Sequence, residues 1–127
     1  MKLLTTKVHG VLDYLMGTIL MASPWIFGFA GHPTAKSIPM VLGAIMILMS
    51  LFTNYELAVS RKLSMKTHLT VDFISGAFLA VSPWLFGFNE YVYLPHLVFG
   101  IAEMGAALIT ETKPHFNEQT PMTGHLR

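Results

Sequence analysis

The sequence matches itself when it is displaced by 59 residues. After the next loop shortens by two residues, Gly43 matches Gly100 and Thr53 matches Thr110. Identities this dense indicate two tandem copies of one unit, at about residues 8–57 and 67–113, so the fold must be built from two similar halves. The identities include His9–His68, Asp13–Asp72, Gly17–Gly76, Ser23–Ser82, Pro24–Pro83, Trp25–Trp84, Phe27–Phe86, Gly28–Gly87 and Phe29–Phe88.

Each unit contains two apolar segments, near residues 8–29 and 38–52 in the first copy and 68–88 and 92–109 in the second. Charged residues make up only 12% of the chain, whereas a soluble domain has about 25%. About 20 helical residues cross the ~30 Å hydrocarbon core, so the first and third segments are long enough and the other two are marginal. No period-two alternation favours strands. The sequence therefore predicts an all-α membrane protein with four transmembrane helices.

The distribution of Lys and Arg predicts the orientation of these helices. Seven of the eight Lys and Arg residues lie near the two ends of the sequence and in the connection between the two copies. The two hairpin loops carry only one, Lys36. Basic residues favour the cytoplasmic side, so both termini are expected there, in a multi-pass protein of the cytoplasmic (inner) membrane. Both copies then share one orientation, related by an axis along the membrane normal. We expect residues 1–111 to form one membrane domain and 112–127 a polar, flexible cytoplasmic tail.

The repeated Ser-Pro-Trp tripeptide has a structural interpretation. Proline removes a backbone donor and kinks or ends a helix, and the preceding serine can satisfy the freed groups. Tryptophan suits the membrane interface. Because a helix that stopped at the proline would be too short to span, we expect a kinked helix that continues to the following glycine. The signature residues are Ser23, Pro24, Trp25, Ser82, Pro83 and Trp84.

Both tripeptides are preceded by His-x-x-x-Asp and followed by Phe-Gly-Phe. In these features the sequence resembles the SPW repeat family of small bacterial membrane proteins. The resemblance covers about four-fifths of the chain. It implies a four-span bacterial membrane protein, and it carries no catalytic residues over.

A polar stripe recurs in both copies. His9, Asp13 and Gly17 share one helical face, and His68, Asp72 and Gly76 repeat the pattern. A carboxylate that faces lipid costs about 2.5–3.5 kcal/mol, and glycine allows close helix approach. Both arguments direct the stripe inward, so we expect the two His/Asp pairs to face each other.

Glu103 is the most isolated charge, since it lies within the last apolar segment. Together with His9, Asp13, His68 and Asp72 it forms a candidate polar cluster in the cytoplasmic half of the bundle. The alternative interpretation is structural: His and Asp one turn apart can hydrogen-bond each other, and a protonated glutamic acid is tolerated in a bundle.

Composition and the absence of sequence motifs exclude or disfavour several classes of function. The absence of cysteine excludes disulfides, thiolate metal sites and covalent c-type haem. A net charge of +1 without a basic stripe gives no reason to expect a nucleic-acid partner. No phosphate-binding loop, nucleophile elbow or zinc-protease motif occurs, so an enzyme is the less favoured class. Away from the stripe, His32 and His96 are interpreted as interfacial histidines near the outer face.

Three functions remain open. The sequence favours a non-catalytic scaffold or accessory subunit that packs against itself or against a membrane partner through its glycines. The first alternative is proton or divalent-cation handling by the candidate cluster, with His9, Asp13, His68 and Asp72 as metal ligands. The second is a haem-binding redox subunit with His9 and His68 as axial ligands.

Overall fold

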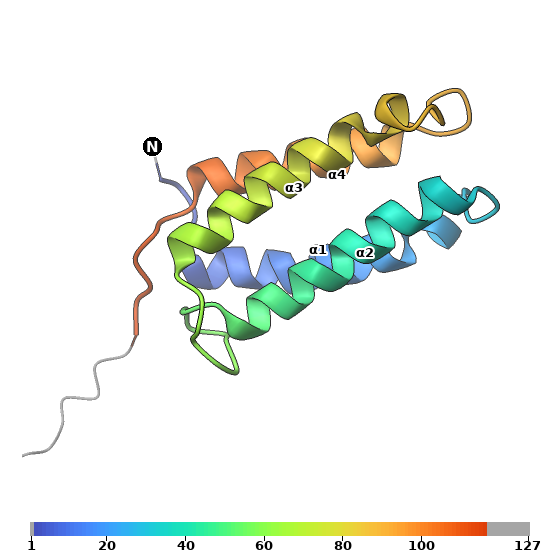
Figure 1. The fold of residues 1–127 in the computed structure, drawn as a ribbon. Coiled ribbons are helices and arrows are strands. Elements are labelled where there is room, and N and C mark those ends of the chain that lie inside the picture. The colour runs from blue at the N-terminus through green and yellow to red at the C-terminus, as the bar shows by residue number, and fades with distance from the viewer. Residues whose placement is uncertain (1, 117–127) are drawn as a thin grey trace, which may run out of the picture.

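The computed structural model describes residues 2–116, which fold into four α-helices arranged as two hairpins side by side (Figure 1). The first hairpin consists of α1 (Thr6–Ile26) and α2 (Pro33–Phe52), and the second of α3 (Met65–Leu85) and α4 (Leu94–Ile109). The described residues contain no β-strand, only two isolated bridges. The predicted all-α class is therefore confirmed. Most of the predicted tail at residues 112–127 lies outside the described residues.

The helix lengths differ in part from the sequence prediction. Helix α2 begins at Pro33, not at residue 38, because the His32 side chain accepts a hydrogen bond from the Ala35 N–H and proline is well suited to a first turn. With 20 residues, α2 is longer than the segment that the sequence predicts, so the prediction that this segment is only marginally long enough to span a membrane is wrong. Helix α4, with 16 residues, is a short apolar helix. By length and composition, α2 and α3 could each cross a membrane.

The serine before each proline has the role that the sequence predicts. Helix α1 continues through Pro24, which leaves the Leu20 carbonyl without its usual N–H donor, and the Ser23 hydroxyl donates to that carbonyl at 2.7 Å. In α3 the Ser82 hydroxyl donates to the Leu79 carbonyl at 2.8 Å. The expected continuation of each helix through its proline is confirmed.

The expected continuation to the glycine is wrong, because each helix ends two residues earlier. Gly28 adopts a φ of 76° and Gly87 a φ of 71°, a left-handed conformation that terminates a helix and favours glycine. The Phe29 N–H then donates to the Pro24 carbonyl at 2.8 Å, as in a Schellman cap. The Phe-Gly-Phe sequence is therefore a helix stop signal.

Glycine pairs bring the two helices of each hairpin into close contact. A Cβ built on Gly43 would lie 2.6 Å from the Gly17 carbonyl oxygen, and one on Gly100 would lie 2.5 Å from the Gly76 carbonyl oxygen. No side chain fits at these crossings, so each hairpin is a tightly packed unit. Gly105, in contrast, faces open space.

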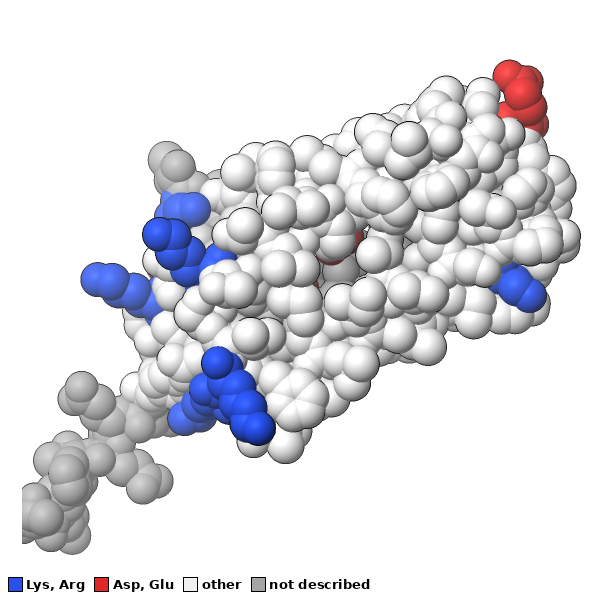
Figure 2. All heavy atoms as spheres, in the orientation of Figure 1, with Lys and Arg blue, Asp and Glu red and all other residues white. Residues whose placement is uncertain are grey.

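The two ends of the bundle differ in charge. Figure 2 shows most Lys and Arg atoms at the end where α1 begins, α4 ends and the α2–α3 connection lies. The opposite end carries the two hairpin turns and the exposed rings of Trp25 and Trp84. There Phe29 and Phe88 are buried between the hairpins together with Ala35. The interpretation of His96 as interfacial is wrong, since it is 1% exposed and its Nε2 lies 2.9 Å from the Ala35 carbonyl.

Candidate functional site

Four buried side chains meet between the two hairpins, near the basic end of the bundle. We call His9, Asp13, His68 and Asp72 the His–Asp cluster; α1 contributes the first two and α3 the last two. One ligand atom from each residue lies within 4.8 Å of the other three. None of the four residues is more than 5% exposed. The polar stripes therefore point inward, as the sequence predicts.

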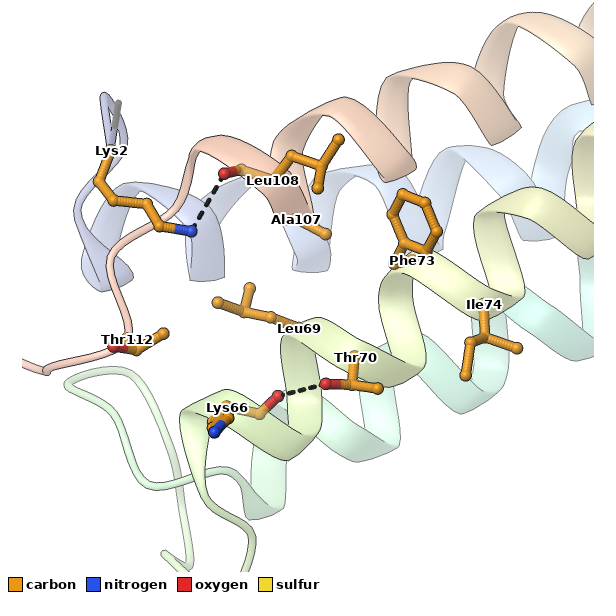
Figure 3. Close-up of a pocket in the computed structure, with 9 residues that line it drawn as sticks. All are labelled: Lys2, Lys66, Leu69, Thr70, Phe73, Ile74, Ala107, Leu108 and Thr112. Carbon is orange, nitrogen blue, oxygen red and sulfur yellow. Dashed lines mark hydrogen bonds between the residues drawn. The ribbon is translucent and has the colours of Figure 1, made fainter.

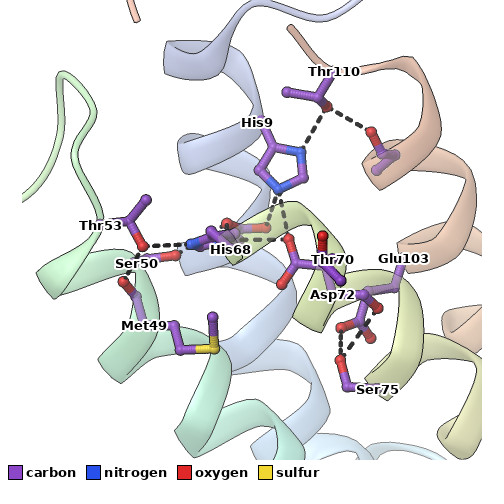
Figure 4. A network of polar contacts seen from close by, with 12 residues as sticks. His9, Met49, Ser50, Thr53, His68, Thr70, Asp72, Ser75, Glu103 and Thr110 are labelled. Carbon is purple, nitrogen blue, oxygen red and sulfur yellow. Dashed lines mark hydrogen bonds and ion pairs between the residues drawn. The ribbon is translucent and has the colours of Figure 1, made fainter. Parts of the chain in front are cut away.

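The shortest contacts in the cluster cross from one half of the chain to the other. The His9 Nε2 lies 2.9 Å from the Asp72 Oδ2, and the His68 Nε2 lies 2.8 Å from the Asp13 Oδ2. The contacts within each helix are longer, at 3.2 Å between His9 and Asp13 and 3.1 Å between His68 and Asp72. Each imidazole Nε2 therefore faces both carboxylates (Figure 4).

Two threonines hold the outer nitrogens of the imidazoles. The His9 Nδ1 lies 2.8 Å from the Thr110 Oγ1, and the His68 Nδ1 lies 2.6 Å from the Thr53 Oγ1. These contacts also cross between the halves, because His9 meets the threonine that follows α4 and His68 meets the threonine that follows α2. Each threonine is positioned by an isolated backbone bridge, to Leu4 or to Leu63.

The threonines determine where the imidazole hydrogens lie. The Thr110 hydroxyl donates its only hydrogen to the Ala106 carbonyl at 2.5 Å, and the Thr53 hydroxyl donates to the Met49 carbonyl at 2.6 Å. Each hydroxyl can then only accept from its histidine, so both Nδ1 atoms carry a hydrogen. The remaining nitrogen, Nε2, is directed at the carboxylates in both halves. This is the arrangement of a metal-binding histidine, whose other nitrogen donates to an outer acceptor.

Glu103 lies beside the cluster and is connected to it through a serine. The Ser75 hydroxyl lies 2.6 Å from the Glu103 Oε1 and 3.2 Å from the Asp72 carbonyl oxygen. The other carboxylate oxygen is buried without a partner among the described residues. The matching positions in the first half are Met16 and Met46, which pack together in the core. Four of the five candidate residues thus form one cluster, and Glu103 is a neighbour present in one half only.

Sequence reasoning missed the hydroxyl groups around the cluster. Thr53 and Thr110 were visible as a matched pair, and that identity is the signal that could have indicated a role. Ser50, which donates to the Asp13 Oδ2 at 3.0 Å, has no such signal because its counterpart is Ala107. The residues of the Ser-Pro-Trp signature lie far from the cluster, in the last turn of α1 and α3.

A tyrosine from the α2–α3 connection lies against the cluster. The Tyr55 ring is 1% exposed and lies 6.4 Å from the His68 ring, measured between centroids. It also covers Gly10, where a Cβ would collide with the ring. Burial raises the pKa of the Tyr55 phenol, so this side chain borders the site as an uncharged group.

The fold and site define a class: an all-helical bundle of two hairpins with a buried His–Asp cluster between them. The SPW repeat domain matches residues 7–110, so the chain belongs to the SPW repeat family. No curated protein and no solved structure matches the chain.

Proposed function

We propose that this protein spans the membrane four times, with both termini cytoplasmic, and binds a divalent metal ion at the His–Asp cluster. Every helix turns a large apolar side chain outward, among them Leu15, Leu48, Ile74 and Ile101, which are 55–62% exposed. Helices α1 and α4 lie beside the apolar helices α2 and α3, so all four share one environment. The gathering of Lys and Arg at one end of the bundle supports a cytoplasmic position for that end.

The direction of the two Nε2 atoms is the observation that carries the proposal. Both imidazoles have their Nδ1 hydrogens committed to threonine, and both present Nε2 to the same two carboxylates. A tetrahedral ion with bonds of about 2.0–2.2 Å separates neighbouring ligand atoms by roughly 3.4 Å. The closest ligand atoms of the cluster lie 2.8 Å apart, and all lie within 4.8 Å. Small side-chain movements are therefore enough to surround one ion.

Charge balance also favours a divalent ion. With both carboxylates ionised, the contacts in the metal-free cluster require a hydrogen on each Nε2, because a carboxylate can only accept. Two positive rings then balance two negative carboxylates in a buried site. One divalent ion that replaces the two Nε2 hydrogens leaves the net charge unchanged, so binding adds no uncompensated charge to the low-dielectric interior. Two imidazoles and two carboxylates suit zinc and other divalent transition metals.

The other two functions fit the geometry less well. A scaffold or accessory subunit explains the glycine crossings, but it requires neither the fixed Nδ1 hydrogens nor the convergence of both Nε2 atoms. A haem between His9 and His68 would have to displace both carboxylates from the space that separates the rings.

Metal analysis of the purified full-length protein tests the proposal. We expect one zinc ion per chain after desalting, and about two protons released per ion in calorimetric titrations in buffers of different ionisation enthalpy. His9→Gln/His68→Gln and Asp13→Asn/Asp72→Asn should abolish binding. The matched control is His96→Gln, which alters a buried histidine outside the cluster and should bind as the wild type does.

Two results would contradict the proposal. The first is a wild-type protein that binds no more metal than the double variants do. The second is a loss of metal in the His96→Gln control equal to that in the cluster variants. Far-ultraviolet circular dichroism of every variant shows whether the helices are retained, and a folded, metal-free wild type with a single self-associated form would support the scaffold instead.

A further inference from the structure

A groove between α3 and α4 opens at the basic end of the bundle, away from the His–Asp cluster. It has a volume of about 300 Å³, which is at the lower end of small-molecule sites. Lys2 and Lys66 line its polar end, and Leu69, Phe73 and Leu108 line its apolar part (Figure 3). One site therefore combines two ammonium groups with a strip of hydrocarbon surface.

The two ammonium groups are available to an anion. The Lys2 Nζ donates to the Leu108 carbonyl at 3.1 Å, which uses one of its three hydrogens. Lys66 lies in the first turn of α3 and is exposed. None of the described residues that line the groove is acidic; Glu111 shares a neighbouring pocket with Lys2 and does not line the groove.

The apolar part of the groove continues from the lysines along the outer surface of the bundle. Phe73 is 36% exposed, Ile74 62% and Leu108 60%. In the proposed membrane placement this surface faces acyl chains, and the lysines lie at the cytoplasmic headgroups. The groove matches an amphiphile with an anionic head and a hydrocarbon tail.

The corresponding place in the other half shows what the groove lacks. Lys7 and Arg61 occupy the positions that match Lys66 and Lys2 under the 59-residue displacement, and both line a second pocket. That pocket also contains the Glu56 carboxylate and the Phe116 ring, which lies 4.1 Å from the Arg61 guanidinium carbon. The chain thus supplies a carboxylate of its own beside the cations in one half, and none of the described residues that line the groove in the other half is acidic.

We propose that the groove between α3 and α4 binds one anionic phospholipid of the cytoplasmic leaflet. Its phosphate accepts hydrogen bonds from Lys2 and Lys66, and an acyl chain lies along Leu69, Phe73 and Leu108. Charge complementarity selects an anionic over a zwitterionic headgroup. The inference rests on the proposed membrane placement and is independent of the proposed metal site.

Native mass spectrometry can test the site with full-length protein extracted from vesicles of equimolar phosphatidylglycerol and phosphatidylcholine. We expect one retained phosphatidylglycerol per chain. Each substitution, Lys2→Gln or Lys66→Gln, should weaken its retention about fivefold, and the double variant Lys2→Gln/Lys66→Gln should weaken it further. The matched control is Lys7→Gln/Arg61→Gln, which removes the same charge from the other half and should retain the lipid.

Equal retention of the two lipids by the wild type would overturn the proposal, as would an equal loss in the two double variants, because either result means that the basic end attracts lipid without a site. Zinc content measured on the same samples separates the two proposals. A variant that loses lipid but keeps zinc supports the lipid site alone, and a wild type that lacks zinc but retains phosphatidylglycerol contradicts only the metal proposal.

Discussion

The threonine contacts allow the metal proposal to be tested without changing a ligand. In the Thr53→Val variant, the His68 Nδ1–H loses its acceptor at 2.6 Å, and in Thr110→Val the His9 Nδ1–H loses its acceptor at 2.8 Å. Both threonines are 0% exposed, so water does not readily replace the lost partner. Valine has nearly the same shape, and the cluster keeps all four ligand residues.

The size of the effect follows from the burial of the lost hydrogen bond. A buried donor left without a partner costs about 1–3 kcal/mol. The imidazole can also rotate or change tautomer, which removes Nε2 from the carboxylates. Loss of such an outer contact typically weakens metal affinity about 10–100-fold. Because both histidines would bind the same ion, we expect the double variant to lose less than the product of the two single effects.

Isothermal titration of purified protein with zinc measures this change. The matched control is Thr18→Val/Thr70→Val, because these threonines also donate to the carbonyl four residues earlier, at 2.8 Å and 2.9 Å, and neither hydroxyl is hydrogen-bonded to a histidine in the described structure. Thermal unfolding without metal shows how much each variant loses in stability alone. Zinc affinity that stays at the wild-type value in Thr53→Val/Thr110→Val would refute the assignment of Nε2 as the metal-binding atom.

Three further predictions concern packing and the polar groups around the site. Gly100→Ala should lower the free energy of unfolding by about 1–3 kcal/mol, because its Cβ would lie 2.5 Å from backbone atoms of α3. The control is Gly105→Ala on the same helix, which faces open space and should be neutral or stabilising. Thermal unfolding in detergent measures both variants, and equal effects would contradict the glycine crossing. Ser75→Met/Glu103→Met copies the methionine pair of the first half and should keep both the thermal midpoint and the zinc affinity. The reason is that the variant removes a buried carboxylate oxygen without a partner together with the serine that contacts the same carboxylate. A large loss of stability would show that Glu103 has an essential contact. At Glu56, partial burial raises the carboxyl pKa, but hydrogen bonds from a threonine hydroxyl and from backbone N–H groups outweigh it, so the pKa lies below its usual value of 4.5. The ionised carboxylate therefore stabilises the fold fully above that pH, and this stabilisation is lost as the pH falls through the lowered pKa. The difference in thermal midpoint between the wild type and Glu56→Gln should shrink only in that acidic range.

Much of the fold follows from local chemistry that the sequence displays directly. The positions of helices α1 and α3 and the inward direction of His9 and Asp13 follow from apolar periodicity and from the cost of a lipid-facing charge. The serine contact before Pro24 follows from the backbone donor that proline lacks. The two-residue error at Gly28 arose because a left-handed glycine and a glycine within a helix look the same in one sequence.

The partners in the His–Asp cluster were beyond the reach of the sequence. Periodicity places His9 and Asp13 on one face and suggests that they pair with each other, yet the shorter contact of His9 is to Asp72 in the other hairpin. That choice depends on how the hairpins dock and rotate against each other, which is the sum of many small packing contacts and has no local signature.

The repeat determined, from sequence alone, that the molecule has two similar halves and that equivalent residues lie at equivalent places. Only the tertiary structure decided how the halves differ in use: Glu103 accepts a hydrogen bond from Ser75 beside the cluster, and no described residue that lines the groove at Lys2 and Lys66 is acidic, whereas its counterpart contains Glu56. The physical reason is that a repeat specifies each unit separately. Contacts between units depend on distance and orientation in space, which the order of residues does not state.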